Sequence, residues 1–399
     1  MSMNRRAFVG ALAVGAAVTL PKLRAQSRYF PGINDGEITL GTTQPLSGGA
    51  VAYSAGIKVA DAYFKTVNKS GGVNGRSLRL IMLDDGFTPP KAVEQTRRLV
   101  EEDKVALLFG SVGTASNLAV RPYLNDAGVP QLFVGSAAAT WSEDHEKYPW
   151  SRGFGPLYTD EGRSIAKHIL ATRPNAKIAG LFATDDAGKD YARGLKSGLG
   201  PAVGQIVKEQ SYEFTDPTVD SQMLSLQASG ADTLVMAASP KIAAQAIRKA
   251  YDSQWRPQIY TIQVATSLPN VLVPAGLEKA KGLISGCYYK DPADTTWADD
   301  PAIKDFNAFM AAFVPNVPRD NLTVEGMCKA LTLIQVLQQC GNDLTRDNIM
   351  RQTSRLDLAL PLLLPGLKVK TSEADPHPIR GGRLQQFDGA SWRVLPENP

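Results

Sequence analysis

The 399-residue chain has few of the side chains from which most catalytic and metal sites are built. Its three histidines, His145, His168 and His377, are far apart in the sequence and show no metal-ligand spacing. Neither an HExxH motif nor a GxSxG turn occurs, which argues against the common zinc-hydrolase and serine-hydrolase arrangements. We therefore expect a protein that is not an enzyme and that needs neither a metal nor an organic cofactor.

Cysteine is equally scarce. The chain contains only Cys287, Cys328 and Cys340, so an odd thiol remains unless two chains pair. Cys328 and Cys340 fall on one expected helix, about 18 Å apart at roughly 1.5 Å per residue, so they cannot form a disulfide with each other. A bond from Cys287 to either of them stays open, and three small buried apolar side chains are the alternative.

The chain also lacks a charge excess once its first residues are set aside. The formal net charge is +4, but residues 1–25 contain Arg5, Arg6, Lys22 and Arg24 and no acid. The rest of the chain therefore balances 39 basic (43 minus 4) against 39 acidic side chains. A neutral chain has no electrostatic footprint for nucleic acid or an anionic membrane, and we expect neither partner.

The first 25 residues are typical of an export signal. Residues 1–6 are basic, and residues 7–20 are apolar and rich in small side chains but short for a membrane span. The segment NRRAFV at 4–9 resembles the twin-arginine export motif. We expect cleavage near Ala25 and a periplasmic location. Because no cysteine precedes residue 287, a lipid-modified N-terminal cysteine is excluded, and we expect a free periplasmic protein.

The remaining pattern predicts two α/β lobes. Short apolar runs typical of strands alternate with amphipathic helical segments from residue 38 to about residue 262, which favours parallel sheets covered on both faces. An irregular aromatic segment at 138–154 interrupts the alternation, as a crossover between lobes would. A second crossover is expected at 282–289. A chain of this length is also too long for one ordinary core.

The segment VALLFGSVGTASN at 105–117 is the centre of the expected binding site. A buried run at 105–109 enters a loop of small residues, and a helix is expected over 117–127. Such a junction points unpaired backbone N–H groups outward, where they bind an anion, and Thr114 adds a hydroxyl. The loop has no lysine and matches no phosphate-binding fingerprint, so it favours a carboxylate. A strand–helix turn without a ligand is the alternative.

Three pairs of adjacent aspartates could act as acid pairs: Asp84 with Asp85, Asp185 with Asp186, and Asp299 with Asp300. We interpret them instead as turn and cap residues, because Asp readily accepts hydrogen bonds from nearby backbone at the ends of strands and helices.

An ordered set of segments resembles the Leu/Ile/Val-binding-protein family, the type I periplasmic solute-binding proteins of ABC importers. It includes ITLGTTQPLSGGAVAYS at 38–54, VALLFGSVGTASN at 105–117, GVPQLFVGSAA at 128–138 and KIAGLFATDDAGKDYARGLKSGL at 177–199. The resemblance covers about 35–395. It implies an α/β fold of two doubly wound, Rossmann-like lobes joined by three hinge crossovers. We expect the first lobe to comprise 33–152 and 288–360, and the second 153–287 and 361–399.

The resemblance also assigns residues to a carboxylate site. In the family, two loops of the first lobe hold the carboxylate of the ligand through backbone N–H groups and hydroxyls. The matching residues here are Ser111, Val112, Gly113 and Thr114 in one loop, and Gly135 and Ser136 in the other.

The family's contacts for a ligand ammonium are replaced in this chain. The matching positions carry Ala137, Ala187 and Gln263, and Tyr53 falls at an aromatic wall position. An ammonium removed from water needs an acid or several acceptors. We therefore expect a carboxylate ligand without an α-ammonium, and the small Ala187 predicts a larger cavity for its apolar body.

The later segments at 268–277, 288–301 and 337–352 resemble a subgroup that takes up aromatic acids such as benzoate and hydroxycinnamate derivatives. The implied protein is a monomer that captures such a carboxylate and delivers it to an ABC permease in the inner membrane. Two alternatives remain: a protein of the same family that binds branched-chain or other amino acids, and a ligand sensor that feeds a signalling receptor. An exported enzyme on this scaffold is disfavoured, because no nucleophile–base pair is apparent.

Overall fold

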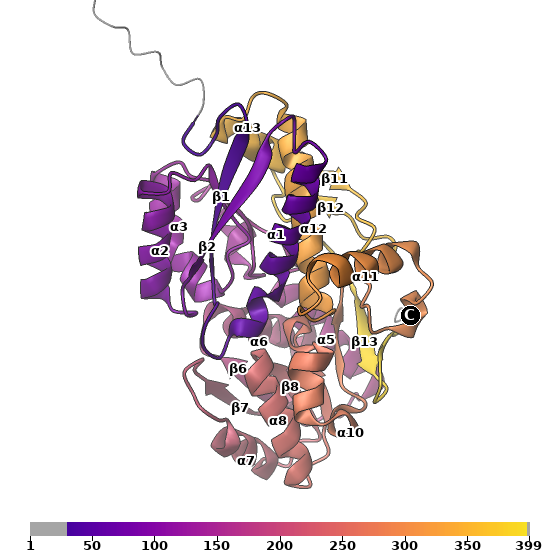
Figure 1. The fold of residues 1–399 in the computed structure, drawn as a ribbon. Helices are drawn as coiled ribbons and strands as arrows, with labels where there is room; N and C mark the ends of the chain where they lie inside the picture. The colour runs from indigo at the N-terminus through magenta and orange to yellow at the C-terminus, as the bar shows by residue number, and fades with distance from the viewer. Residues whose placement is uncertain (1–29, 397–399) are drawn as a thin grey trace, which may run out of the picture.

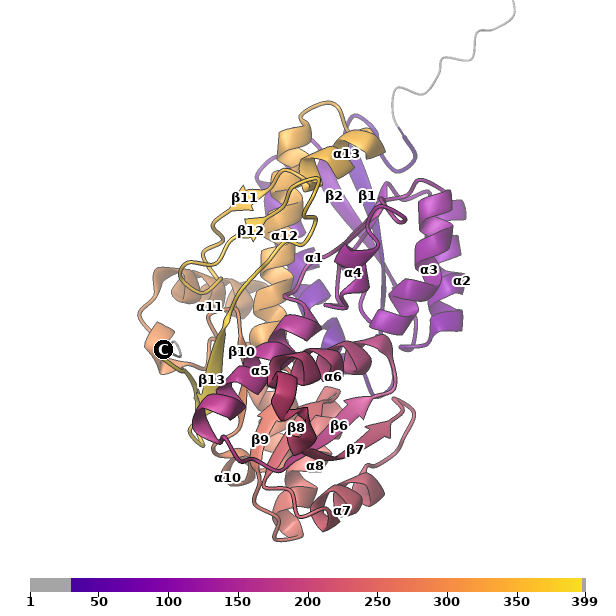
Figure 2. The same ribbon diagram turned by 180° about the vertical axis from the view of Figure 1, so that it is seen from behind.

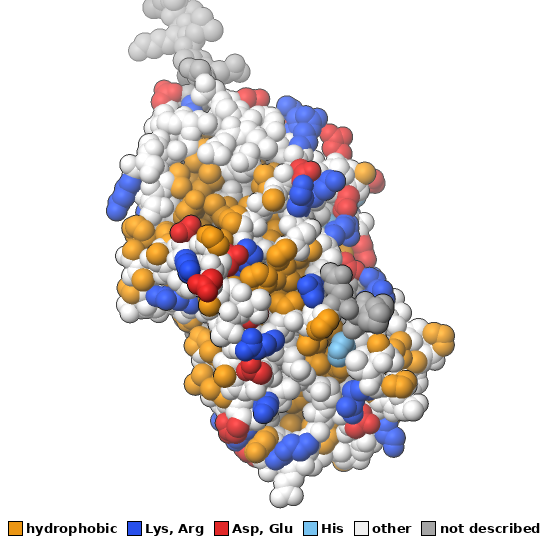
Figure 3. Space-filling view, turned by 90° about the vertical axis from the view of Figure 1, so that its right-hand side faces the viewer, with side chains coloured by type: hydrophobic (Ala, Val, Ile, Leu, Met, Phe, Trp, Pro, Cys, Tyr) orange, Lys and Arg blue, Asp and Glu red, His pale blue; other side chains and the backbone are white. Residues whose placement is uncertain are grey.

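Two β-sheets, one in each lobe, organise the computed structural model, which describes residues 30–396 (Figure 1). The expected export signal at 1–25 lies outside the described residues. Within them, no helix combines the length and the apolar character needed to cross a membrane. On the face in Figure 3, basic and acidic side chains are interspersed, in keeping with the balanced charge count.

The first lobe contains a parallel five-stranded sheet with the order β2-β1-β3-β4-β5. Its strands are β1 (Glu37–Gln44), β2 (Ser77–Asp84), β3 (Leu107–Phe109), β4 (Gln131–Val134) and β5 (Ser151–Gly153). Every residue of β1 after Glu37 is buried, as expected for a parallel strand covered on both faces. The helices of this lobe are α1 (Ala55–Lys69), α2 (Pro89–Glu101), α3 (Thr114–Asp126), the short α4 (Thr140–Glu143) and, from late in the chain, α11 (Pro301–Phe313), α12 (Asn321–Cys340) and α13 (Arg346–Thr353).

The second lobe contains a seven-stranded sheet with the order β14-β13-β10-β9-β8-β6-β7. Its parallel strands are β6 (Ile178–Ala183), β7 (Ile206–Tyr212), β8 (Thr233–Ala237), β9 (Gln258–Thr261) and β10 (Ile284–Cys287), and β13 (Arg383–Phe387) and β14 (Trp392–Val394) complete an antiparallel edge. The helices, several of them visible from behind in Figure 2, are α5 (Tyr158–Thr172), α6 (Asp186–Leu199), α7 (Asp220–Ala228), α8 (Pro240–Asp252) and the short α9 (Val273–Ala275) and α10 (Leu277–Ala280). The expected α/β class with two lobes is confirmed.

The chain crosses between the lobes three times. The first crossover follows β5, and the second follows β10, because Tyr288 and Tyr289 already belong to the core of the first lobe. The third lies later than expected. A short hairpin pairs β11 (Asp357–Leu358) with β12 (Val369–Lys370), and Ile379 still packs in the first-lobe core. Segment 361–379 therefore belongs to the first lobe, which corrects the boundary that we had expected at 360.

The helix that follows the site loop begins earlier than expected. Helix α3 begins at Thr114 rather than at residue 117, because Gly113 takes a φ of +104° and turns the chain directly from the loop into the helix. Thr114 therefore stands in the first helical turn, beside backbone N–H groups that no preceding turn can pair.

The three cysteines form no disulfide with one another. Cys287, Cys328 and Cys340 are all buried and unpaired.

Candidate ligand-binding site

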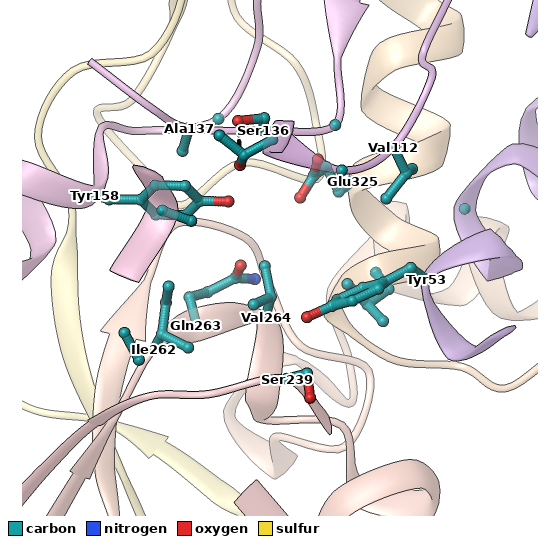
Figure 4. Close-up of a pocket in the computed structure, with 18 of the residues that line it drawn as sticks. Tyr53, Val112, Ser136, Ala137, Tyr158, Ser239, Ile262, Gln263, Val264 and Glu325 are labelled. Atoms are coloured by element: carbon teal, nitrogen blue, oxygen red, sulfur yellow. Dashed lines mark hydrogen bonds between the residues drawn. The ribbon is translucent and has the colours of Figure 1, made fainter. Parts of the chain in front are cut away.

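A cavity of about 110 Å³ lies between the lobes, and both lobes line it (Figure 4). A single water needs only about 10–15 Å³ of such space, so the cavity is large enough for a small organic solute. Nine of the ten residues assigned from the sequence line it: Tyr53, Val112, Gly113, Thr114, Gly135, Ser136, Ala137, Ala187 and Gln263. Within the described residues, no three His, Cys, Asp or Glu side chains are grouped so that they could hold a metal ion.

Ser111 is the assigned residue that the structure does not bring to the cavity. Its Oγ accepts a hydrogen bond from the backbone N–H of Thr43, at 3.1 Å, and lies 3.4 Å from the hydroxyl of Thr42. The side chain therefore ties the loop to β1. This corrects its assignment as a ligand contact. No local pattern indicates the direction in which the hydroxyl points.

Ser136 and Thr114 form a hydroxyl pair at the first-lobe wall, with their oxygens 2.8 Å apart. Ser136 Oγ also accepts from the indole Nε1–H of Trp141 at 3.0 Å and from the backbone N–H of Ala138 at 3.3 Å. With both lone pairs occupied, Ser136 can donate only to Thr114. The hydroxyl proton of Thr114 is then available to another oxygen, and the neighbouring phenol of Tyr158 accepts it.

Tyr158, at the start of α5, supplies a further hydroxyl that the sequence analysis missed. Figure 4 shows its side chain beside Ala137, at the same side of the cavity as Ser136. Burial raises the pKa of Tyr158, and hydrogen bonds from the backbone of Ala137 and from Thr114 offset part of this increase. The phenol therefore remains a neutral donor. Its position directly after the first crossover, where the chain passes between the lobes, was the sequence feature that could have indicated this residue.

The expectation of a site without an acid is wrong. Glu325 on α12 lines the cavity, where it forms an ion pair with Lys329 at 2.6 Å; their side chains are only 16% and 8% exposed. Asp185 also lines the cavity, although its carboxylate caps α6 by accepting from Gly188 N–H. Sequence comparison with the family's ammonium positions missed Glu325 because α12 lies far along the chain from every assigned loop.

Four of the six paired aspartates, Asp84, Asp85, Asp185 and Asp300, accept from nearby backbone N–H groups, as interpreted, whereas Asp186 and Asp299 form ion pairs with lysines. Asp185 caps α6 and Asp300 caps α11, each by accepting from backbone N–H groups. Asp84 accepts from the backbone N–H groups of Leu46 and Ser47 and pairs with Lys91. Burial raises the pKa of Asp185, and the two backbone hydrogen bonds at the helix start lower it again in part.

Glu161 supports the second-lobe wall of the site. Its Oε1 accepts from the backbone N–H of Gln263 at 2.8 Å and from that of Gly286 at 3.3 Å. It therefore joins α5, the segment that carries Gln263, and β10. Desolvation raises the pKa of Glu161 to about 7. The amide group of Gln263 makes no side-chain hydrogen bond to the described residues, and Figure 4 shows it directed into the cavity.

Contacts between the lobes close the space around this site. Asn321 Nδ2 donates to the backbone oxygen of Gln263 at 3.0 Å, and the backbone N–H of Ala139 donates to Asp190 at 2.7 Å. The arrangement thus has neutral donors on one wall, an ion pair on α12 and apolar surface between them. Two such lobes closed around a solute-sized cavity define a binding protein of the two-lobed, hinge-closing class.

Comparison with known proteins identifies the family. The model of the periplasmic binding protein family matches residues 37–391, and the chain belongs to this family. The Leu/Ile/Val-binding protein homolog 7 of Brucella abortus is 23% identical over 55% of this chain and 57% of its own length. The leucine-specific-binding protein of Salmonella typhimurium is 25% identical over 36% of this chain and 38% of its own length. The chain thus spans about half or less of these curated relatives, and the resemblance to the Leu/Ile/Val-binding-protein family is confirmed.

Solved structures share the fold. A solute-binding protein of an R. palustris ABC transporter, solved with benzoate, gives a TM-score of 0.78 at 20% identity, covering 90% of this chain and 96% of that one. A branched-chain amino-acid ABC transporter protein from Thermus thermophilus, solved with valine, gives 0.79 at 14% identity, covering 92% and 97%. At these identities the likeness establishes the fold alone.

Proposed function

We propose that this protein is the extracytoplasmic solute-binding component of an ABC importer and that it captures a small carboxylate with an apolar body. An aromatic acid, such as a benzoate or hydroxycinnamate derivative, is the class of ligand that we favour. The loaded protein would deliver it as a monomer to the permease in the inner membrane, because closure of the lobes creates the surface that a permease can distinguish from the open form.

The observation that carries the proposal is the combination of neutral donors, one cation and apolar walls in a single cavity. Ser136, Thr114 and Tyr158 form a row of hydroxyls in which each donates to the next, and the last proton, on Tyr158, suits a carboxylate. Lys329 is the one lysine or arginine among the described residues that line the cavity. An ammonium group has three donors, and only one bond to Glu325 is formed. Lys329 can therefore also bind an anionic ligand.

Binding of an amino acid is the second candidate, and Glu325 is the observation that favours it. A carboxylate in a cavity that also offers Thr114 and Ser136 could hold the ammonium while the hydroxyls hold the carboxylate. Against it, Glu325 is already neutralised by Lys329 at 2.6 Å, and Asp185 is engaged at the start of α6. An ammonium would have to share the single negative charge of Glu325 with Lys329, which would leave a net positive charge buried.

A ligand screen separates the two candidates. The purified protein is heated with benzoate, 4-hydroxycinnamate, leucine or valine, and binding is confirmed by calorimetry. A ligand present at about 100 times its Kd adds roughly 2.7 kcal/mol to the free energy of unfolding. Stabilisation by the aromatic acids but not by the amino acids supports the proposal. Tight binding of leucine or valine without binding of the aromatic acids refutes it.

A further inference from the structure

Phe87 and Phe214 meet across the gap between the lobes. Their ring centroids are 4.9 Å apart with an interplanar angle of 66°, an edge-to-face contact. Phe87 follows β2, the edge strand of the first sheet, whereas β5, which leads to the first crossover, is at the opposite edge. Phe214 follows β7, the edge strand of the second sheet, and β10 and β13, which adjoin the other crossovers, lie toward the opposite edge. The contact is therefore on the side of the cavity away from the hinge.

The backbone of Phe87 is held in an unusual conformation. Its φ is +60°, in the left-handed region that bulky side chains rarely adopt. The buried Asp85 accepts from the backbone N–H of Phe87 at 2.8 Å, and the neighbouring Asp84 binds the backbone of Leu46 and the ammonium of Lys91. These bonds fix the turn, so that the strained residue keeps its ring aimed at the other lobe. Strain that is maintained in this way is typical of functional positions.

The ring of Phe87 is also built into the first-lobe wall. It stacks on Tyr53, with centroids 5.6 Å apart and an interplanar angle of 25°. A Cβ atom at Gly113 would lie 2.9 Å from Phe87 Cε2, so the site loop needs glycine there to admit the ring. On the other lobe, Phe214 packs against Tyr212 with centroids 5.9 Å apart. Four rings thus form a continuous chain between the lobes, and all four line the cavity.

We propose that Phe87 and Phe214 form an aromatic latch that keeps the closed lobes together over the bound solute. This inference rests on the proposed function, in that it requires a solute held between the lobes. The contact can exist only in the closed state, and both rings become more exposed when the lobes separate. Release of the solute must break the contact, whereas entry into the open cleft does not require it. The latch therefore sets the lifetime of the complex between the protein and its solute. Both phenylalanines act by holding the two lobes in the closed position.

Stopped-flow kinetics test the latch on the full mature protein. The probe is whichever of benzoate, 4-hydroxycinnamate, leucine and valine binds the wild type most tightly. In Phe87→Ala and Phe214→Ala, the dissociation rate should rise roughly tenfold, while the association rate stays within about threefold. Phe313→Ala, at the exposed end of α11, serves as the matched control and should change neither rate. Equal dissociation rates in the wild type and both variants overturn the proposal.

The double variant adds a second criterion. Since either substitution alone removes the ring-to-ring contact, Phe87→Ala/Phe214→Ala should release the probe about as fast as the faster single variant. Fully multiplicative effects would show that the two rings act independently, which also overturns the latch. If leucine rather than an aromatic acid proves to be the tight probe, the proposed ligand class fails while the kinetic criteria for the latch still apply.

A third measurement uses cross-linking with the probe present at a saturating concentration, so that the lobes are closed. In the variant Phe87→Cys/Phe214→Cys, a short bismaleimide should join the two lobes, and neither single cysteine variant should give the product. The three native cysteines are buried and serve as the internal background. Failure to obtain the cross-link with the probe bound and both thiols shown to be reactive contradicts the proposed contact.

Discussion

Glu325 and Lys329 stand one helical turn apart on α12 and form an ion pair 2.6 Å long inside the ligand cavity. A buried ion pair adds little net stability, because desolvation of two charges offsets their attraction. Here each partner keeps further hydrogen-bonding capacity on the side of the cavity. The pair is therefore the first place to test which charge the ligand carries.

Replacement of Lys329 by Met should weaken benzoate binding about 10–100-fold, because it removes the cation and leaves Glu325 to repel the carboxylate. Isothermal titration calorimetry measures the change. Lys290→Met is the matched control, because Lys290 forms an equally short pair with Asp300 but does not line the cavity. Unchanged affinity in Lys329→Met, with the control also unchanged, would remove Lys329 from the site.

Replacement of Glu325 by Gln distinguishes the two ligand classes. For a carboxylate ligand, the loss of a nearby negative charge should leave the affinity unchanged or increase it several-fold. For an amino acid, the ammonium would lose its acid, and affinity should fall by at least about tenfold. The same titration series with benzoate and leucine decides between them, and a loss of benzoate binding would contradict the proposed polarity of the site.

Ser136 and Ser111 make a matched pair of substitutions in neighbouring loops. Ser136→Ala removes the hydroxyl that orients Thr114 and, through it, Tyr158, and should lower carboxylate affinity about tenfold. Ser111→Ala breaks a bond to β1 and should instead reduce the free energy of unfolding by about 1 kcal/mol with little change in affinity. Calorimetry and denaturant unfolding of both variants provide the comparison. A larger effect on affinity in Ser111→Ala would restore the original assignment.

Glu161 should make stability depend on pH. Its pKa rises from 4.5 to about 7 on folding, so the folded state binds the proton more tightly. The contribution of Glu161 to the free energy of unfolding is present at low pH. It is lost as the pH rises from about 4.5 to 7, by roughly 3 kcal/mol in total. Unfolding by urea across this range should show the decline in the wild type and a flatter profile in Glu161→Gln. Identical pH profiles for the two proteins would contradict this role.

Gly326 should be intolerant of a methyl group. A Cβ atom there would lie 2.2 Å from the backbone oxygen of Gly56, where α12 crosses α1. Gly326→Ala should therefore cost about 1–3 kcal/mol of unfolding free energy and distort the adjoining cavity wall. Gly204→Ala, where no atom lies within 4 Å of the added methyl, should be neutral or slightly stabilising. Chemical denaturation compares them, and equal stabilities would show that the helices can separate freely.

The elements that follow strong local patterns were predictable. The buried run before Gly110 becomes β3, and the Pro-initiated segment at 89 becomes α2, because hydrophobic period and helix-start signals act within a few residues. The lobe to which segment 361–379 belongs was not predictable. The segment has little regular structure, and only its core contacts, such as those of Ile379, assign it to the first lobe.

The sequence by itself determined the α/β alternation, the family and nine residues of the cavity wall, because loops after parallel strands meet at one edge of a sheet whatever the remaining packing. Only the tertiary structure decided that Ser111 points away from the cavity, that Tyr158 lies beside the hydroxyls of Thr114 and Ser136, and that Glu325 and Lys329 enter the cavity from α12. Side-chain direction and contacts between distant segments depend on how the two lobes and the late helices pack, and no local pattern encodes that geometry.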